Sequence, residues 1–337
     1  MFLKSTTQMS SILVLLLLGL LSSITGAESI GVCYGVIADR LPSKQEVVDL
    51  YKSNGIGKMR IYFPEAETLD ALRGSGIELI MDVARESLQA MTDQNAATDW
   101  VRTNVIPYAQ DVNFKYIAVG NEVRPDQNEA QYILSAMRNI QNAISSANLQ
   151  GQIKVSTAID SSFISNSYPP NDGIFNSESY VRPIIEFLKS NGSPLLANVY
   201  PYFAYIYDKQ HIPLDYALFT QQGQNSVGYQ NLFDAMLDSI YAALEKVGAP
   251  DVKIVVSESG WPSEGGDGAS TQNAATYYAN LINHAKGGSG TPKRPGGSIE
   301  TYLFAMFDEN NKHGEESERH FGLFTPDKSP KYQLSFN

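Results

Sequence analysis

The chain has 337 residues, and its 36 acidic against 25 basic side chains give a formal charge of −11 at neutral pH. Nucleic-acid binding is excluded, because an acidic chain lacks the dense basic face that neutralises phosphates, and acidic substrates are disfavoured for the same reason. With 43% hydrophobic and 18% charged residues, the chain is predicted to fold as a globular protein and not to be disordered.

The first residues have the pattern of a secretory signal peptide. Lys4 supplies a positive charge, the run from Ile12 to Leu21 is apolar, and Ala27 is a small residue of the kind that a signal peptidase reads. The apolar run is much shorter than the roughly 20 residues that cross a bilayer, so a membrane anchor is disfavoured. We therefore predict a signal peptide at residues 1–27, a mature domain at residues 28–337, and a secreted protein.

Eight short runs rich in β-branched and aromatic residues alternate with longer stretches of helical periodicity. In chain order, the predicted strands are Ser29 to Tyr34, Lys58 to Phe63, Glu78 to Val83, Lys115 to Val119, Ile153 to Ala158, Leu195 to Tyr200, Lys253 to Ser257 and Thr301 to Phe307. Most are continuously apolar, as in the strands of a parallel sheet buried on both faces. Eight βα units without a linker favour a single-domain (β/α)8 TIM barrel over an open doubly wound sheet.

The stretches between these runs carry helix signals. Ser43 and Glu46 have the spacing of a capping box, and Gly55 is placed to end the helix that follows. Two stripes repeat at helical spacing: Ile133, Met137, Ile140 and Ile144, and then Phe233, Met236, Ile240, Leu244 and Val247. We interpret both stripes as core faces and not as cofactor sites.

Other catalytic machineries lack support in the sequence. Cys33 is the only cysteine and lies in an apolar run, so we expect a buried inert thiol and no disulfide. The four histidines, His211, His284, His313 and His320, do not have metal-ligand spacing, and no phosphate-binding loop is present. We expect neither a metal nor another cofactor.

Two of the predicted strands end in a carboxylate. Glu122 follows the strand that ends near Val119, and Glu258 follows the strand that ends at Ser257. In a barrel of this kind the working residues project from the C-terminal ends of the strands. Each Glu taken alone could form a salt bridge that closes the barrel top. Two together favour glycoside hydrolysis, in which one carboxyl is a protonated acid and the other an ionised base or nucleophile.

Five motifs stand in order along the chain, each at a boundary between a predicted strand and helix. They are Ile-Gly-Val-Cys-Tyr-Gly at residues 30–35, Met-Arg-Ile-Tyr at 59–62, Val-Gly-Asn-Glu-Val at 119–123, Asn-Val-Tyr-Pro-Tyr-Phe-Ala-Tyr at 198–205 and Val-Val-Ser-Glu-Ser-Gly-Trp-Pro at 255–262. In these motifs, and in residues 304–312 and 318–324, the chain resembles glycoside hydrolase family 17, in particular plant endo-1,3-β-glucanases of the pathogenesis-related type.

The resemblance implies a barrel with a long groove across the strand C-termini and retaining hydrolysis of internal β-1,3 linkages in 1,3-β-glucans. It implies Glu122 as the acid/base and Glu258 as the nucleophile. It also matches Glu309, Lys312 and Glu318 to a charged cluster near the nucleophile, for which a surface ion pair is the alternative.

Polar and aromatic residues near the strand ends are candidates for contacts with sugar. Asn121 is expected to hydrogen-bond the sugar 2-hydroxyl or to cap its strand. The aromatic candidates are Tyr34, Tyr62, Tyr200, Tyr202, Phe203, Trp261 and Phe321. Aromatic rings can stack on the apolar faces of sugars, and we expect at least three of these rings to face the groove, although each alone could be core packing.

Two alternative functions stay open at this point. The chain has Val83-Ala84-Arg85 where many family members have Val-Pro-Asn, so a mixed-linkage 1,3-1,4-β-glucanase (licheninase) is one alternative. A non-catalytic glucan-binding defence protein on the same barrel is the other, although both carboxylates are present. In each case we expect a monomer in the apoplast or cell wall whose partner is a β-glucan, with no nucleic-acid or membrane partner.

Overall fold

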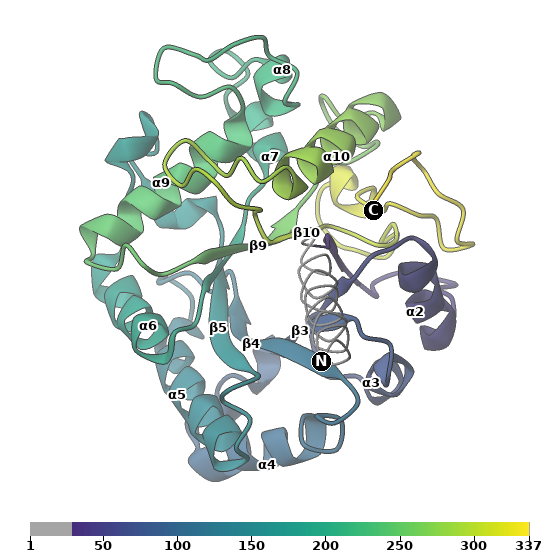
Figure 1. Cartoon of the computed structure of the whole chain (residues 1–337), viewed down its shortest axis with the longest axis vertical. Helices are drawn as coiled ribbons and strands as arrows, with labels where there is room; N and C mark the ends of the chain where they lie inside the picture. The colour runs from purple at the N-terminus through teal and green to yellow at the C-terminus, as the bar shows by residue number, and fades with distance from the viewer. Residues whose placement is uncertain (1–28, 337) are drawn as a thin grey trace, which may run out of the picture.

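Eight parallel strands close into a barrel, seen end-on in Figure 1. The computed structural model describes residues 29–336, so the predicted signal peptide at residues 1–27 lies outside the described residues. The strands follow one another around the barrel as β1 (Gly31–Cys33), β2 (Lys58–Ile61), β3 (Glu78–Val83), β4 (Asn113–Asn121), β5 (Lys154–Ile159), β8 (Leu195–Asn198), β9 (Ile254–Ser259) and β10 (Thr301–Leu303). The predicted (β/α)8 architecture is confirmed.

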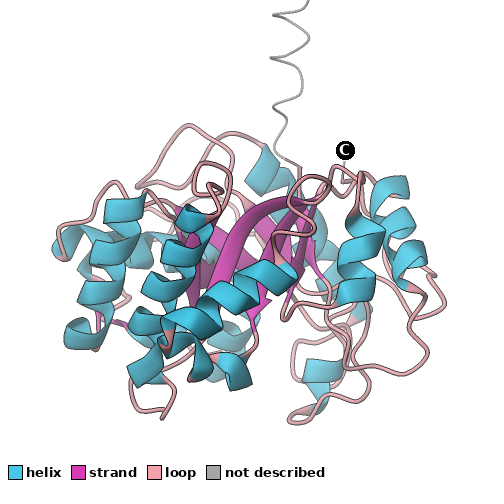
Figure 2. Ribbon diagram, turned by 90° about the horizontal axis from the view of Figure 1, so that it is seen from below, coloured by secondary structure: helices cyan, strands magenta, loops and turns pink. Residues whose placement is uncertain are grey.

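Helices surround the strands and cover the outer face of the barrel (Figure 2). They are α2 (Lys44–Ser53), α3 (Ala66–Leu72), α4 (Gln94–Asn104), α5 (Ala130–Ser146), α6 (Glu178–Asn191), α7 (Pro201–Tyr207), α8 (Leu214–Ala217), α9 (Leu232–Lys246) and α10 (Thr271–Lys286). Within residues 29–336, no helix combines the length and the apolar character that crossing a membrane requires.

The local signals in the sequence act as predicted. The side chain of Ser43 accepts from the backbone of Glu46, whose own side chain accepts from the backbone of Ser43, and Gly55 has the left-handed φ of 72°. The stripe from Ile133 to Ile144 is the buried face of α5. In α9, Phe233, Ile240 and Leu244 are buried.

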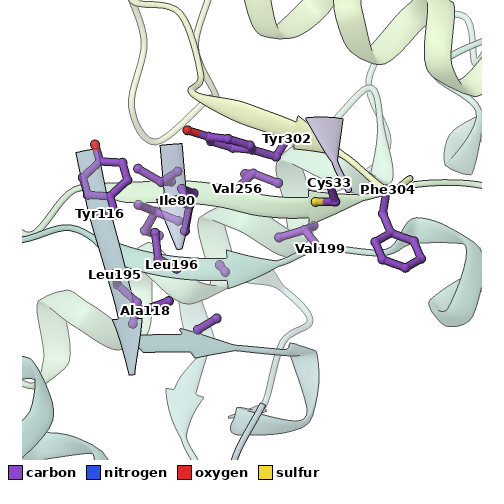
Figure 3. Close-up of a cluster of buried hydrophobic side chains, with 14 of the residues drawn as sticks. Cys33, Ile80, Tyr116, Ala118, Leu195, Leu196, Val199, Val256, Tyr302 and Phe304 are labelled. Atoms are coloured by element: carbon purple, nitrogen blue, oxygen red, sulfur yellow. The ribbon is translucent and has the colours of Figure 1, made fainter. Parts of the chain in front are cut away.

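The barrel interior changes character along its axis. Near the N-terminal ends of the strands, Lys115 Nζ lies 2.8 Å from Glu78 Oε2 and 3.0 Å from Glu300 Oε1. Apolar side chains from several strands then meet in a cluster, in which Figure 3 shows Cys33 and Val256. The thiol of Cys33 is buried, as predicted, and donates to the carbonyl of Ser257 at 3.3 Å, and burial raises its pKa. Polar groups return only at the C-terminal end, as described below.

Several connections differ from the simple alternation of strand and helix. A short hairpin of β6 (Ile164–Ser165) and β7 (Ile174–Phe175) lies between β5 and α6, and its two-residue strands are too short to leave a periodic signal. The last strand, predicted to reach Phe307, ends at Leu303. The short 3-10 helix η5 (Glu316–Arg319) follows it in place of a full helix, because the remaining segment is rich in turn-forming glycine, proline and polar residues.

Candidate active site

The end of β4 presents two neighbouring side chains to the same place. In a regular strand, consecutive side chains face opposite sides. Here Gly120 takes a φ of 86°, with no room for a Cβ, which would lie 2.5 Å from Ile133 Cδ1, and Glu122 takes a φ of 54°. As a result, the Nδ2 group of Asn198 donates both to Asn121 Oδ1 at 3.0 Å and to Glu122 Oε1 at 2.7 Å. The turn therefore brings the predicted acid and its neighbouring amide into one hydrogen-bonded group.

Three donors orient the carboxylate of Glu258 at the end of β9. Arg60 Nη1 donates to Oε1 at 2.9 Å, the Tyr62 hydroxyl donates to Oε1 at 2.8 Å, and the Tyr200 hydroxyl donates to Oε2 at 2.7 Å. Glu258 is only 6% exposed. The side chain is thus fixed in one orientation by groups from β2 and from the β8–α7 connection.

Asn198, at the end of β8, links the two glutamates. Its amide nitrogen donates to Glu122, while its amide oxygen accepts from the Ser257 hydroxyl at 2.8 Å and from Arg60 Nη1 at 3.2 Å. The ladder between β8 and β9 shifts register at this point, so that Asn198 pairs with Glu258. Asn198 is therefore hydrogen-bonded to Glu122 and, through Arg60, connected to Glu258.

Arg60 is the residue of this site to which sequence reasoning gave no role. Its guanidinium is fully buried and donates to Asp82 through Nε at 3.2 Å and Nη2 at 2.7 Å, and Nη2 also donates to Asn121 Oδ1 at 3.0 Å. An arginine inside an apolar strand was the available signal, because such a buried cation requires acidic partners. Asp82, in the middle of an apolar strand, carried the same signal.

The pKa of Glu122 suits a general acid. Burial, together with the negative charge of Glu258, raises the pKa of Glu122 to about 7, and the hydrogen bond from Asn198 opposes this rise. The carboxyl of Glu122 is therefore protonated below about pH 7. Two carboxyl groups in different environments are the arrangement that lets one act as a proton donor while the other acts as a base or nucleophile.

The predicted charged cluster is assembled in the structure. Lys312 Nζ lies 3.0 Å from Glu318 Oε2 and 4.0 Å from Glu309 Oε2, and Glu309 Oε1 accepts from the backbone of Ile37 at 3.1 Å. Burial raises the pKa of Glu309, which is 4% exposed, so the cluster is not merely a surface ion pair. The cation in contact with Glu258 is Arg60, and Lys312 acts on Glu258 at longer range.

A pocket of about 350 Å³ lies beside the carboxylates, at the C-terminal ends of β1 to β4. Tyr62 and Asn121 line the pocket. The Tyr62 hydroxyl also donates to Glu258, and Asn121 accepts from Arg60, which itself donates to Glu258. Tyr34 and Glu309 also line it, as does the exposed ring of Phe63, which was not among the candidates. The pocket thus offers aromatic and polar surface next to the candidate catalytic groups.

The aromatic candidates separate into two groups. Tyr34 and Tyr62 line the pocket, and Tyr200 and Phe203 are half-buried, with ring centroids 5.3 Å apart. The rings of Tyr202, Trp261 and Phe321 are at most 2% exposed. For these three, the alternative of core packing applies, because they pack against one another and their neighbours, as in Tyr202 and Trp261, whose ring centroids are 5.1 Å apart.

No metal site accompanies these groups in residues 29–336, where no three His, Cys, Asp or Glu side chains are arranged to hold an ion. Two of the histidines contact single carboxyl groups: His284 Nε2 lies 2.7 Å from Asp234 Oδ1, and His320 Nε2 lies 3.1 Å from Glu316 Oε1.

The chain is similar to known proteins along most of its length. Residues 30–336 match the sequence profile of glycosyl hydrolases family 17. The acidic isoform GI9 of glucan endo-1,3-beta-glucosidase from Nicotiana tabacum is 58% identical over 330 residues, which cover 96% of each chain.

Two solved structures are similar along nearly their whole length. CJP38, a beta-1,3-glucanase and allergen of Cryptomeria japonica pollen, has a TM-score of 0.89 at 48% identity, covering 92% of this chain and 99% of its own. A structure from a study of two plant beta-glucan endohydrolases with distinct substrate specificities has a TM-score of 0.86 at 41% identity, covering 91% and 100%. With the family profile matched across the whole barrel and both carboxylates in place, the chain belongs to glycosyl hydrolases family 17.

Proposed function

We propose that the protein hydrolyses internal β-1,3-glucosidic linkages of 1,3-β-glucans with retention of configuration, with Glu122 as acid/base and Glu258 as nucleophile. The observation that carries the proposal is the pairing of a carboxyl with a pKa of about 7 at Glu122 with a carboxylate at Glu258 that three donors orient. Support for the substrate comes from the relative described above as a glucan endo-1,3-beta-glucosidase, which matches 96% of the chain.

In the first step of the proposed reaction, a carboxylate oxygen of Glu258 attacks the anomeric carbon and forms an ester bond. The glycosidic bond breaks, its electron pair stays on the leaving oxygen, and that oxygen takes the proton of Glu122. The hydroxyls of Tyr62 and Tyr200 hold Glu258 in place for the attack. Asn121 lies beside Glu122, where an amide can contact the sugar 2-hydroxyl.

In the second step, water attacks the anomeric carbon and gives its proton to the carboxylate of Glu122. The ester bond breaks, and its electron pair returns to Glu258, so that both residues regain their starting states. Two displacements at one carbon produce the β anomer. Nuclear magnetic resonance of the first-formed product distinguishes this course from a single displacement, which would give the α anomer and contradict the proposal.

The choice of polymer is tested by initial rates on laminarin and on mixed-linkage 1,3-1,4-β-glucan. The proposed enzyme hydrolyses laminarin rapidly, because the β-1,3 linkage that it cleaves is present throughout that polymer. A licheninase would ignore laminarin and cleave the mixed-linkage polymer. Binding of laminarin without release of reducing sugar would instead identify a glucan-binding protein.

We also propose that the protein is secreted and acts as a monomer. Gel filtration of the protein recovered from culture medium tests both points.

The pH dependence of the reaction should follow the proton of Glu122. Because the acid must be protonated, we expect kcat/KM on laminarin to fall as the pH rises through about 7. The hydrogen bond from Asn198 lowers the pKa of Glu122, so Asn198→Ala should move this fall to higher pH while lowering the maximal rate. A fall that stays in place or moves to lower pH in Asn198→Ala would contradict this assignment of the acid.

A further inference from the structure

Two carboxylates share the one buried cation at the centre of the site. Arg60, Asp82 and Glu258 are 0%, 2% and 6% exposed, so water screens none of their charges well. Asp82 and Glu258 each form an ion pair with Arg60, whose charge opposes the rise that burial causes in the pKa of Asp82. With all three groups charged, the trio carries one net negative charge. The proposed chemistry uses Glu258 and gives no part to Asp82.

Asp82 is the stronger partner of Arg60. It receives two hydrogen bonds side-on, from Nε at 3.2 Å and from Nη2 at 2.7 Å, whereas Glu258 receives one, from Nη1 at 2.9 Å. Burial alone would lower the pKa of Arg60, and the charge of Asp82 opposes burial more strongly than that of Glu258, so that this pKa is raised. Such a bidentate pair also fixes the plane of the guanidinium, and thereby the directions of its remaining N–H groups.

The balance of charge changes during the reaction. When Glu258 becomes an ester, it loses its negative charge, and Arg60 loses that ion pair. A buried cation without a counter-ion is strongly unfavourable. With Asp82 present, Arg60 stays neutralised throughout, and the trio changes from one net negative charge to none. Without that carboxylate, the trio would change from neutral to one net positive charge, and the carboxylate that forms on Glu122 in the same step would act on Arg60 only at longer range.

We propose that Asp82 is a positioning residue that neutralises and orients Arg60 while Glu258 is esterified, so that the first chemical step does not strand a buried cation. The proposal rests on the retaining mechanism proposed above. It predicts that loss of Asp82 slows formation of the glycosyl-enzyme but not its hydrolysis, because hydrolysis restores the charge of Glu258 beside Arg60.

Aryl β-laminaribiosides with different leaving groups separate the two steps. A 4-methylphenyl group leaves poorly, so the first step limits kcat, whereas a 2,4-dinitrophenyl group leaves readily and makes the second step limiting. We expect Asp82→Asn to lower kcat about 10- to 100-fold on the first substrate, with little change in KM, and to change kcat by less than about threefold on the second. The ratio of the two kcat values in one preparation does not depend on the fraction of protein that is folded.

Asp82→Glu keeps the charge and should retain more activity on the 4-methylphenyl substrate than Asp82→Asn. Asp99→Asn is the matched control, since it removes an Asp–Arg pair on the exposed side of α4, and both of its rates should equal those of the parent. Equal losses on both substrates in Asp82→Asn, or no loss on either, would overturn the proposal. Failure of the retaining mechanism would appear separately, as an α-anomeric product from the parent enzyme.

Discussion

Glu258→Ala is expected to lower the rate of reducing-sugar release from laminarin by about 10⁵-fold or more. The variant lacks the oxygen that attacks the anomeric carbon, and the Arg60, Tyr62 and Tyr200 donors are left facing an empty position. Binding of glucan should persist, because the substitution leaves the residues that line the pocket, such as Tyr34, Phe63 and Asn121, in place. The measurement is the initial rate beside the affinity for laminarin, both compared with the parent.

Rescue of Glu258→Ala by a small external anion tests the role of Glu258 more specifically. Azide can occupy the space left by Glu258 and attack an aryl glycoside from the face that the carboxylate used, giving the α-glycosyl azide. Glu67→Ala, which removes an exposed carboxylate on α3, is the matched control and should keep the parent rate. Release of oligosaccharides at the parent rate by Glu258→Ala would sink the assignment of the nucleophile.

Glu122→Gln should lower kcat on laminarin about 10³-fold, since general acid catalysis contributes roughly 10²- to 10⁴-fold. The glutamine preserves the shape of the side chain but cannot give a proton to the leaving oxygen. With 2,4-dinitrophenyl β-laminaribioside, whose leaving group needs no proton, the first step should proceed almost normally and the glycosyl-enzyme should accumulate. A burst of dinitrophenol followed by slow turnover is the expected time course.

The stereochemistry of azide rescue distinguishes the two glutamates. In Glu122→Ala, azide replaces water in the second step and should give the β-glycosyl azide, opposite to the product of Glu258→Ala. The fall of activity above about pH 7 should also disappear, because the group responsible is absent. The same anomer from both variants, or an unchanged pH profile in Glu122→Ala, would show that the roles are assigned wrongly.

The barrel could be predicted from the sequence because its signals are local. Each strand is a short apolar run, as in Glu78–Val83, whose predicted and observed bounds agree. The capping box of Ser43 and Glu46 predicts the start of the helix after β1. The two glutamates were also visible, since a carboxylate directly after an apolar run stands at the C-terminal end of a barrel strand.

The contacts among the supporting groups could not be predicted, because they depend on register and packing between distant strands. Arg60 and Asp82 lie on neighbouring strands, but Asn198 and Glu258 reach Arg60 from the other side of the barrel. No spacing in the sequence encodes that meeting. The burial of the aromatic rings could not be predicted for a related reason. Trp261 follows a strand as a groove residue would, yet side-chain packing buries its ring completely.

In the proposed mechanism, Glu258 carries the sugar between the two steps. A 2-deoxy-2-fluoro aryl laminaribioside slows both steps, and the second enough for the covalent intermediate to be isolated, digested and located by mass spectrometry. One fluoroglycosyl group on the peptide that contains Glu258, absent from Glu258→Ala, is the predicted result. A label on another residue, or rapid turnover by the parent enzyme without any covalent adduct, would show that Glu258 is not the nucleophile.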